Sequence, residues 1–282
     1  MQSKGTRKNK KHSVLWQLRW YLLLIAEAAL VFSVLKIAQY KRETDASSTI
    51  NEELAREAVV VVSEEPAAPE EAQTEEVTIP DGGEAVAISG RDDGFPIEVD
   101  FDTLLEKNPD CVAWLYSEDT PINFAVLQAD DNTYYLYRVF DGTYNGYGTI
   151  FLDCNCAPGF SNSNSVIFGH DMRNGTMFGS LRNYSDQEYY EQHKTLWLAT
   201  PTANYRLTAV AGYVHDDSSS LYVTPISRSM TDTLVPVAIT ESVFDSGCKY
   251  NPDARYVTLS TCSSSYSEGR FALICEMTKV SG

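Results

Sequence analysis

The stretch Tyr256-Val-Thr-Leu-Ser-Thr-Cys262, followed closely by Glu268-Gly-Arg270-Phe-Ala-Leu-Ile-Cys275, decides the fold. Polar and apolar residues alternate along the first part, which predicts a β-strand with one polar face. The small polar residues between the two parts predict a turn, after which a second strand begins at Arg270. A thiol and a guanidinium at the ends of adjacent strands can face one cleft, where they suit a nucleophile and a stabiliser of negative charge.

The net charge of −17 at pH 7 is spread unevenly over the 282 residues. Residues 1–40 carry seven basic side chains against one acidic, residues 41–100 carry four against seventeen, and the remainder has a net charge of −10. Nucleic-acid binding depends on clustered Lys and Arg that neutralise phosphates. The acidic body therefore argues against nucleic acid as a partner. The length leaves room for one large domain or two small ones.

The six cysteines do not point to a metal or to a disulfide framework. An even number permits disulfides, but the spacing is not that of a dense framework, and whether any pair forms stays open. Cys154-Asn-Cys156 has the spacing of half a metal site, which no second pair and no nearby histidine completes. We therefore expect no metal and no cofactor. Every cysteine except Cys262 is expected to be an unreactive thiol.

A basic head over residues 1–13 precedes an apolar run over residues 14–38. The length of the run suits one membrane-spanning helix of about 20 residues. Glu27 near its middle costs insertion energy on the order of a few kcal/mol, unless it is protonated or paired within an oligomer. A cleaved signal peptide is the alternative, but the run is long and no small-x-small cleavage site follows before Lys41. We favour an uncleaved signal anchor.

The regions on either side of the run set the expected topology. Because the basic flank precedes the span and the acidic flank follows it, the positive-inside rule places the N-terminus in the cytoplasm and the body outside the cell membrane. Residues 39–94 are rich in Glu, Ala, Pro and Ser and cannot bury a core. They predict an extended, acidic extracellular linker that sets the reach from the membrane, with a brief helix over residues 51–62 as one option.

Residues 95–282 predict one folded, mainly β domain with a short helix over residues 102–108 near its start. Eight short runs bounded by Asn, Asp, Gly or Pro predict the strands of a closed or nearly closed eight-stranded β-barrel: 122–127, 134–139, 149–152, 165–168, 195–199, 205–214, 256–261 and 271–276. Three more helical segments are expected: 176–184, a segment to residue 193 opened by the capping box Ser185-Asp-Gln-Glu188, and 230–244. The last is inserted before the cysteine strand.

Cys262, His170 and Arg270 are the candidates for catalysis. Cys262 lies between Thr261 and Ser263, a polar setting that favours a reactive thiol over a buried small hydrophobe. His170 also lies at a strand end, 92 residues away in the sequence, so the two must meet through the fold. A structural histidine is the alternative. Arg270 offers charged, forked donors to an oxyanion or a substrate backbone, against the alternative of a surface ion pair.

These segments carry a family resemblance. Val166-Ile-Phe-Gly-His170-Asp-Met172, Thr258-Leu-Ser-Thr-Cys262 and the strand that opens at Arg270 resemble the three signatures of sortases, the membrane-anchored cysteine transpeptidases of Gram-positive bacteria. The order and the local sequence of each signature fit together, and the resemblance extends from residue 100 to the C-terminus. Other stretches are most similar to class B: 110–115, 121–124, 131–136, 148–153, 175–178 and the inserted helix at 230–244.

The resemblance implies a mechanism and an eight-stranded sortase-like barrel. The Cys262 thiolate attacks the carbonyl of the Thr in a sorting signal on a secreted protein and forms a thioacyl-enzyme. His170 protonates the departing amine and then acts as a base toward an amine of a peptidoglycan precursor. Arg270 holds the oxyanion or the substrate. Ser263 stands where some relatives have an acidic residue, which puts a carboxylate partner for this loop in doubt.

The resemblance also assigns substrate-binding positions. Asn132 and Leu136 match family positions that line the substrate groove, as does Ser260 beside the cysteine. Class B members are similar in favouring Asn-Pro-x-Thr signals, although the sequence names neither the pentapeptide nor the acceptor amine. Two alternatives stay open: a hydrolase of the same architecture, and a non-catalytic tethered barrel in which Cys262→Ala leaves function intact.

Overall fold

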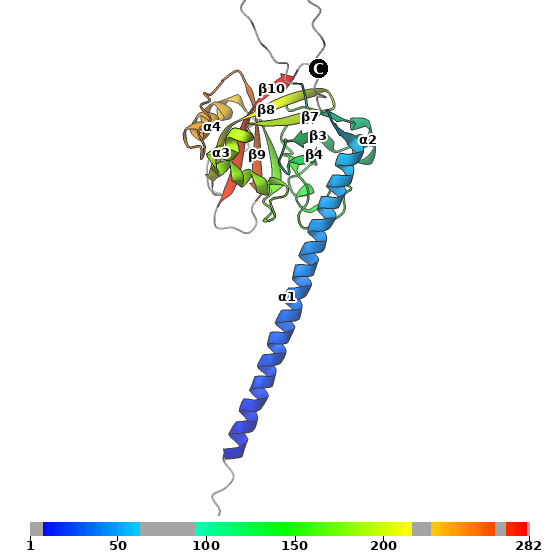
Figure 1. The fold of residues 1–282 in the computed structure, drawn as a ribbon, viewed down its shortest axis with the longest axis vertical. Helices are drawn as coiled ribbons and strands as arrows, with labels where there is room; N and C mark the ends of the chain where they lie inside the picture. Colours follow the sequence, from blue (N-terminus) through cyan, green and yellow to red (C-terminus); the bar gives the residue numbers. More distant parts are fainter. Residues whose placement is uncertain (1–7, 63–93, 216–226, 263–268, 281–282) are drawn as a thin grey trace, which may run out of the picture. The chain divides into compact units, whose positions relative to one another are not determined.

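The computed structural model of the chain describes residues 8–62, 94–215, 227–262 and 269–280. The chain divides into two compact units, Met1–Thr49 and Ile50–Gly282. The first unit is the N-terminal part of one long helix, α1 (Lys8–Ala58), drawn in blue in Figure 1. Within the described ranges α1 is the one helix long and apolar enough to cross a membrane, with a mean hydropathy of 2.0 in its most apolar window.

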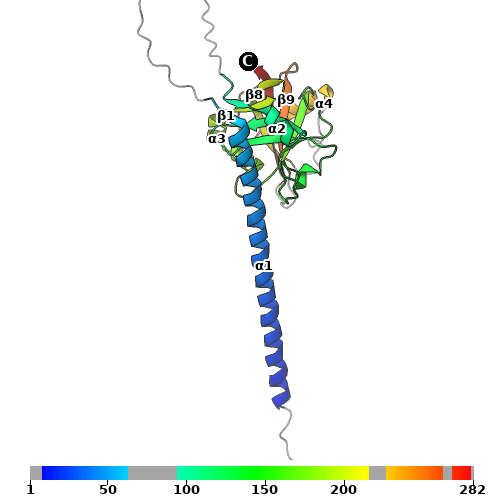
Figure 2. The ribbon, with the colours of Figure 1, turned by 90° about the vertical axis from the view of Figure 1, so that its right-hand side faces the viewer.

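The C-terminal end of α1 belongs to the second unit. Leu54 and Ala58 are buried in an apolar cluster that includes Leu104 of α2 (Phe101–Lys107). The Asn51 side chain donates a hydrogen bond of 2.8 Å to the first backbone carbonyl of the fourth strand. Figure 2 shows this end of α1 beside α2. The contacts anchor the helix end on the folded domain.

A two-stranded sheet follows α1 directly. β1 (Val59–Val61) pairs antiparallel with β2 (Ile97–Val99). Within the predicted linker over residues 39–94, the sequence allows a brief helix over residues 51–62; in the structure the chain is helical without a break to the end of α1, and β1, which was not predicted, follows at once. The reason is that residues 50–59 carry apolar side chains that the domain can bury. Residues 63–93 lie outside the described part of the chain.

Eight strands of the second unit close into a barrel, in the order β10-β8-β7-β3-β4-β5-β6-β9 (Figure 1). Neighbouring strands are antiparallel except for two parallel pairs, β4 with β5 and β6 with β9. Alternate side chains from all eight strands fill the interior as one apolar cluster, which the period of two predicts. The strands are β3 (Cys111–Tyr116), β4 (Asn123–Leu127), β5 (Phe151–Leu152), β6 (Asn164–His170), β7 (Thr195–Thr200), β8 (Ala203–His215), β9 (Arg255–Cys262) and β10 (Arg270–Val280).

Two further apolar clusters lie on the outer face of the barrel. One includes Val166 and Phe168 of β6 and is covered by α2 and the 3-10 helix η1 (Tyr135–Tyr137). The other joins β8, β9 and β10 to α4 (Arg228–Thr240). Because β6 and β9 are neighbours, the first cluster lies on the β6 side of their pairing and the second lies on the β9 side. Figure 1 shows α2 and α4 on opposite sides of the barrel.

Residues 134–139 do not form the strand that the sequence predicts. The Asp131 carboxylate accepts hydrogen bonds of 2.7 and 2.8 Å from the backbone N–H groups of Thr133 and Tyr134, and this turns the chain into η1. Tyr135 is then buried at only 2% exposure. The missing barrel strand is β3, a run that the prediction of eight strands did not count.

The helices largely follow the prediction, with shifted ends. The segment expected at 176–184 is the 3-10 helix η2 (Phe178–Ser185). The next helix, α3 (Gln187–Gln192), is capped by Asp186, whose carboxylate accepts from the Glu188 backbone N–H at 2.8 Å. The cap is therefore one residue later than the predicted capping box. α4 is capped by the Ser227 side chain.

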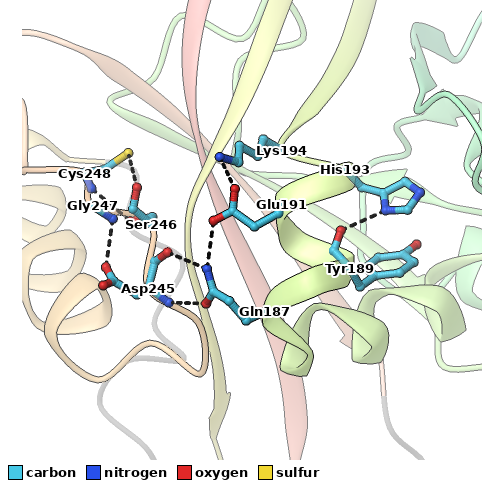
Figure 3. Close-up of polar contacts among 9 residues, drawn as sticks. All are labelled: Gln187, Tyr189, Glu191, His193, Lys194, Asp245, Ser246, Gly247 and Cys248. Atoms are coloured by element: carbon cyan, nitrogen blue, oxygen red, sulfur yellow. Dashed lines mark hydrogen bonds and ion pairs between the residues drawn. The ribbon is translucent and has the colours of Figure 1, made fainter.

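A polar clamp joins α3 to the segment that follows α4 (Figure 3). The Gln187 side chain accepts from the Asp245 backbone N–H at 2.8 Å and donates to the carbonyl oxygen of the same residue at 3.0 Å. Beside the clamp, Phe244 stacks on Tyr190 with ring centroids 4.1 Å apart. These contacts fix the path from α4 toward β9.

Candidate active site

His170 and Cys262 are register partners. β6 and β9 run parallel, and their pairing continues from Asn164 and Tyr256 to His170 and Cys262, the last residue of each strand. Neighbouring strands in a sheet lie about 4.8 Å apart. The parallel pairing thus brings together two residues that are 92 positions apart in the sequence.

Arg270 is the first residue of β10, on the other side of β9. β10 pairs antiparallel with β9, with Ala272 opposite Ser260. This pairing ends at Ala272 and Ser260, two residues before Arg270 and Cys262 are reached. His170, Cys262 and Arg270 therefore lie in a row of strand ends, where β6 and β9 end and β10 begins. We call this row the His-Cys-Arg row.

Two local features, one at each end of β6, fix the strand in place. The Thr258 hydroxyl of β9 donates to Asn164 Oδ1 of β6 at 3.0 Å, and both residues are buried. At the other end, a Cβ on Gly169 would lie 2.7 Å from the Phe178 ring. The strand can approach η2 this closely only because residue 169 is glycine. The close packing sets the position of His170.

The η1 segment, residues 128–148, supplies the hydrogen-bond partner of His170. Its Nε2 lies 3.0 Å from the backbone carbonyl oxygen of Leu136. Because a carbonyl oxygen only accepts, Nε2 carries the proton and Nδ1 is the proton acceptor of the neutral ring. The Tyr147 ring meets the imidazole in a T-shaped contact, with centroids 6.5 Å apart. The ring is therefore oriented from two sides.

Burial lowers the pKa of His170 below its usual value of 6.5, although the Leu136 hydrogen bond and the Asp171 charge partly offset the effect. The neutral imidazole is thus the main form of the ring at neutral pH. A neutral imidazole can take a proton from a thiol and later deliver it to a leaving amine.

The five described cysteines outside the His-Cys-Arg row are free thiols, so no disulfide forms among them. Burial raises the pKa of Cys111 to about 12 and that of Cys156 to about 11, and it also raises the pKa of Cys275. Cys154 and Cys248 are partly exposed. Since the thiolate is the nucleophile, the buried three are inert at neutral pH.

Asn132 and Leu136, two of the predicted substrate-binding residues, both have structural contacts. Asn132 Nδ2 donates to Asp153 Oδ2 at 3.0 Å, and its Oδ1 accepts from the Cys154 backbone N–H at 2.8 Å. Its amide thus holds the turn after β5 against the start of the η1 segment. Leu136 is half-buried, and its backbone contacts His170.

Ser260, the third predicted residue, lies on β9 beside the His-Cys-Arg row. It is 3% exposed, and its hydroxyl oxygen has no hydrogen-bond partner among the described residues. Leaving a buried hydroxyl without a partner is unfavourable by about 1–3 kcal/mol. The loop 263–268, which includes the predicted Ser263 position, lies outside the described residues.

The sequence analysis did not identify two neighbours of His170. One is Tyr147. The other is an ion pair between Asp171 and Arg182, in which Arg182 Nε donates to Asp171 Oδ2 at 2.7 Å. An acidic residue directly after a candidate histidine is a signal that could have been followed, but its partner lies on η2 and is found only through the fold. In the described ranges no group of three or more His, Cys, Asp or Glu could hold a metal ion.

Comparison with known proteins places this site in a family. The family model described as a sortase domain matches residues 118–278. Sortase B of Listeria monocytogenes serovar 1/2a is 32% identical over 176 residues, which cover 60% of this chain and 70% of that protein. The structure of the Staphylococcus aureus sortase B-substrate complex is similar with a TM-score of 0.60 and 29% identity, over 64% of this chain and 85% of that one.

A structure of sortase B complexed with triglycine is similar to the same degree, with a TM-score of 0.60 and 28% identity over 64% of this chain and 86% of that chain. The family match spans β4 to β10 and so includes the whole His-Cys-Arg row. The chain belongs to the sortase family, in class B, and is a cysteine transpeptidase.

Proposed function

We propose that the protein cleaves a C-terminal sorting signal of the Asn-Pro-x-Thr or a similar Pro-x-Thr type after its Thr, and transfers the acyl group to an amine of the cell wall. The observation that carries the proposal is the His-Cys-Arg row. One row of strand ends on β6, β9 and β10 holds an imidazole-bearing, a thiol-bearing and a guanidinium-bearing residue. These are the groups that acyl transfer through a thioester requires.

In the first step the Cys262 thiolate attacks the carbonyl carbon of the Thr residue, and a tetrahedral oxyanion forms. Collapse of this intermediate breaks the C–N bond, and the departing amine takes a proton from the His170 imidazolium. In the second step an acceptor amine attacks the thioester, His170 takes the amine proton, and the thiolate leaves. One peptide bond is broken and one is formed. Because Leu136 engages Nε2, Nδ1 exchanges the proton in both steps.

Arg270 is assigned to the oxyanion or to the substrate backbone. Its guanidinium stays charged at all relevant pH values and offers forked donors. A fixed donor aimed at developing charge contributes most in a site from which water is excluded. The position of Arg270 at the start of β10, which pairs with the strand that ends at Cys262, supports this role.

The proposed substrate is a peptide, and the proposed acceptor is an amine of a peptidoglycan precursor. The sortase B-substrate complex and the sortase B complex with triglycine support these two classes. Ser260, two residues before Cys262 on β9, is the third proposed substrate-binding position. Leu136 would contact the signal through its half-buried side chain, and Asn132 would shape the same side by holding its turn.

We assign the apolar part of α1 to a single membrane span over residues 14–38. The basic head then lies in the cytoplasm and the catalytic domain (residues 95–282) outside, where secreted proteins and cell-wall precursors meet. The apolar composition of α1 supports the span, and the charge asymmetry of its flanks supports the orientation.

The test is turnover of a panel of fluorogenic pentapeptides by the full chain in detergent micelles, with and without triglycine as the acceptor. We expect cleavage of one Pro-x-Thr peptide and a triglycine-linked product. Cys262→Ala should abolish cleavage, whereas Cys154→Ala, which removes a partly exposed thiol outside the row, should leave it intact. Cleavage with only the free acid as product would establish the hydrolase alternative. Cleavage that survives Cys262→Ala would overturn the proposal.

A further inference from the structure

An ion pair between Asp171 and Arg182 lies next to His170 in the chain. Asp171 follows the last residue of β6, and its side chain is 9% exposed. Both Nε and Nη2 of Arg182 donate to Asp171 Oδ2, the former at 2.7 Å. Two donors on one oxygen of a nearly buried carboxylate hold that carboxylate in one orientation. The pair connects the end of β6 to η2.

The chain between the two partners is tightly folded. Asp171 and Met177 form an isolated antiparallel bridge, and Met177 has a positive φ of 50° despite its side chain. A Cβ on Gly179 would lie 2.2 Å from the Met172 carbonyl oxygen. A non-glycine residue in this backbone region persists only where its surroundings enforce it. The backbone of residues 171–179 is therefore conformationally restricted, so the position of Arg182 on η2 constrains the position of Asp171.

We propose that Asp171 and Arg182 act as a positioning pair for His170, in which the carboxylate stabilises the imidazolium formed during acyl transfer and the guanidinium fixes and moderates that carboxylate. This inference rests on the proposed function of His170 as the proton carrier. Both partners act through His170, and neither is assigned a contact with substrate.

Several groups around His170 influence the balance between its neutral imidazole and its charged imidazolium. Burial disfavours the imidazolium, whereas the Leu136 carbonyl and the Asp171 charge favour it. Tyr147, from the η1 segment, is the titratable group in ring contact with it. Cys262 is its register partner on β9, and Arg270 is the first residue of the next strand, β10. The Asp171 carboxylate therefore opposes the effect of burial on the imidazolium.

The two halves of the pair should shift the His170 titration in opposite directions. Asp171→Asn removes the negative charge and leaves the guanidinium, so the pKa of His170 should fall. Arg182→Gln leaves the carboxylate without its moderating cation, so the pKa of His170 should rise. Arg182→Lys keeps the charge and should stay near the wild type. The opposite signs test whether both charges act on the imidazole, and the change in kcat/KM tests whether that action matters for turnover.

The measurement is NMR titration of ¹³Cε1-labelled histidine in the full chain in detergent micelles. The chain has four histidines, so the His170 signal can be assigned from single His→Gln variants. Arg173→Gln is the matched control, because it removes an exposed cation from the same segment. Opposite shifts in Asp171→Asn and Arg182→Gln, with a smaller one in Arg173→Gln, would support the pair.

Shifts of the same sign, or no shift in either variant, would overturn it. If Asp171→Asn does not fold, the comparison of Arg182→Gln with Arg182→Lys decides: equal titrations of His170 would contradict the inference. In peptide turnover, the removal of either partner, by Asp171→Asn or by Arg182→Gln, should reduce kcat/KM by about tenfold. The reason is that a small misplacement of a reacting group has a large effect on the rate. The acid limb of the pH profile should move with the NMR titration.

The NMR result does not depend on turnover, so the two claims fail separately. Opposite shifts of the His170 pKa without turnover of any peptide would contradict the proposed function but support the effect of the ion pair on His170. Turnover by the wild type without opposite shifts would support the proposed function and contradict the positioning pair.

Discussion

Two segments cover the outer face of the barrel on either side of β6 and β9, and they are built in different ways. The α4 segment, residues 227–248, packs a helical apolar stripe against β8, β9 and β10. The η1 segment, residues 128–148, contains one turn of 3-10 helix and is held by side chains that bond backbone groups. The bond to His170 comes from the irregular segment. We infer that the α4 segment stabilises the fold by regular packing, whereas the η1 segment orients His170 by hydrogen bonding.

This difference predicts that damage to the η1 segment affects turnover first, and that damage to the α4 segment affects stability first. Four variants test the comparison, starting with the largest effect.

Gly148→Ala should have the largest effect. Gly148 has a φ of +55°, and a Cβ there would lie 2.2 Å from the Tyr135 carbonyl oxygen and 2.5 Å from that of Leu136. Because both are backbone atoms, η1 must shift and move the partner of His170. We expect kcat/KM to fall by about 100-fold or more. Gly142→Ala is the matched control, since it has a φ of +80° but meets only the Tyr134 hydroxyl at 3.6 Å. Equal losses in both variants would contradict the account.

Phe244→Ala should lower the free energy of unfolding by about 3 kcal/mol, because it removes a buried ring and leaves a cavity. Phe244 is 4% exposed and stacks on Tyr190. The kcat of the molecules that remain folded should change little. The measurement is chemical denaturation beside active-site-normalised turnover, with Val243→Ala, at an exposed neighbour, as the control. A loss of kcat with unchanged stability would reverse the assignment of the two segments.

Gln187→Ala should lower the free energy of unfolding by about 1 kcal/mol, since it removes the exposed clamp to the Asp245 backbone. Gln192→Ala removes a glutamine from the same helix and should be close to neutral. Thermal unfolding of the two variants side by side measures the difference. No difference between them would mean that the clamp adds nothing to the α4 segment.

The smallest effect is a pH dependence of stability. The pKa of His170 is lowered by burial below the 6.5 of the unfolded chain, so the folded state binds fewer protons than the unfolded state between the two values. Stability should therefore fall as pH drops through 6.5, and level off below the folded pKa. His170→Gln should make the unfolding free energy flatter in this window. A steeper dependence in the variant would contradict the stated direction.

The sequence predicts the parts of the fold that have a regular period. Alternation and turn residues lead to the barrel, and the short helix near its start is found as α2. The inserted helix is found as α4, because its apolar stripe has helical spacing. The run 134–139 predicts a strand because it is short, largely apolar and bounded by Asn and Asp. The Asp131 carboxylate decides otherwise, and no period reveals such a bond.

The candidate site divides in the same way. Cys262, His170 and Arg270 are recognisable in sequence because each lies at a strand end within a motif. The register that sets them in one row, and the sign of the His170 pKa shift, come from the fold. The Leu136 carbonyl could not be predicted, since a backbone oxygen carries no sequence signal. The packing of residues 50–59 was hidden by the acidic composition of the linker around them.

The central claim is that the His-Cys-Arg row forms a thioacyl-enzyme and passes the acyl group to an amine. The most direct measurement is intact-mass analysis of the full chain after brief reaction with an intact Pro-x-Thr peptide that the protein cleaves. The mass is recorded before and after addition of triglycine. We predict a mass increase equal to the acyl fragment, located on Cys262, absent in Cys262→Ala, and lost on addition of triglycine as the peptide–triglycine product appears. An enzyme that turns over without the adduct, or an adduct on another cysteine, would contradict the claim.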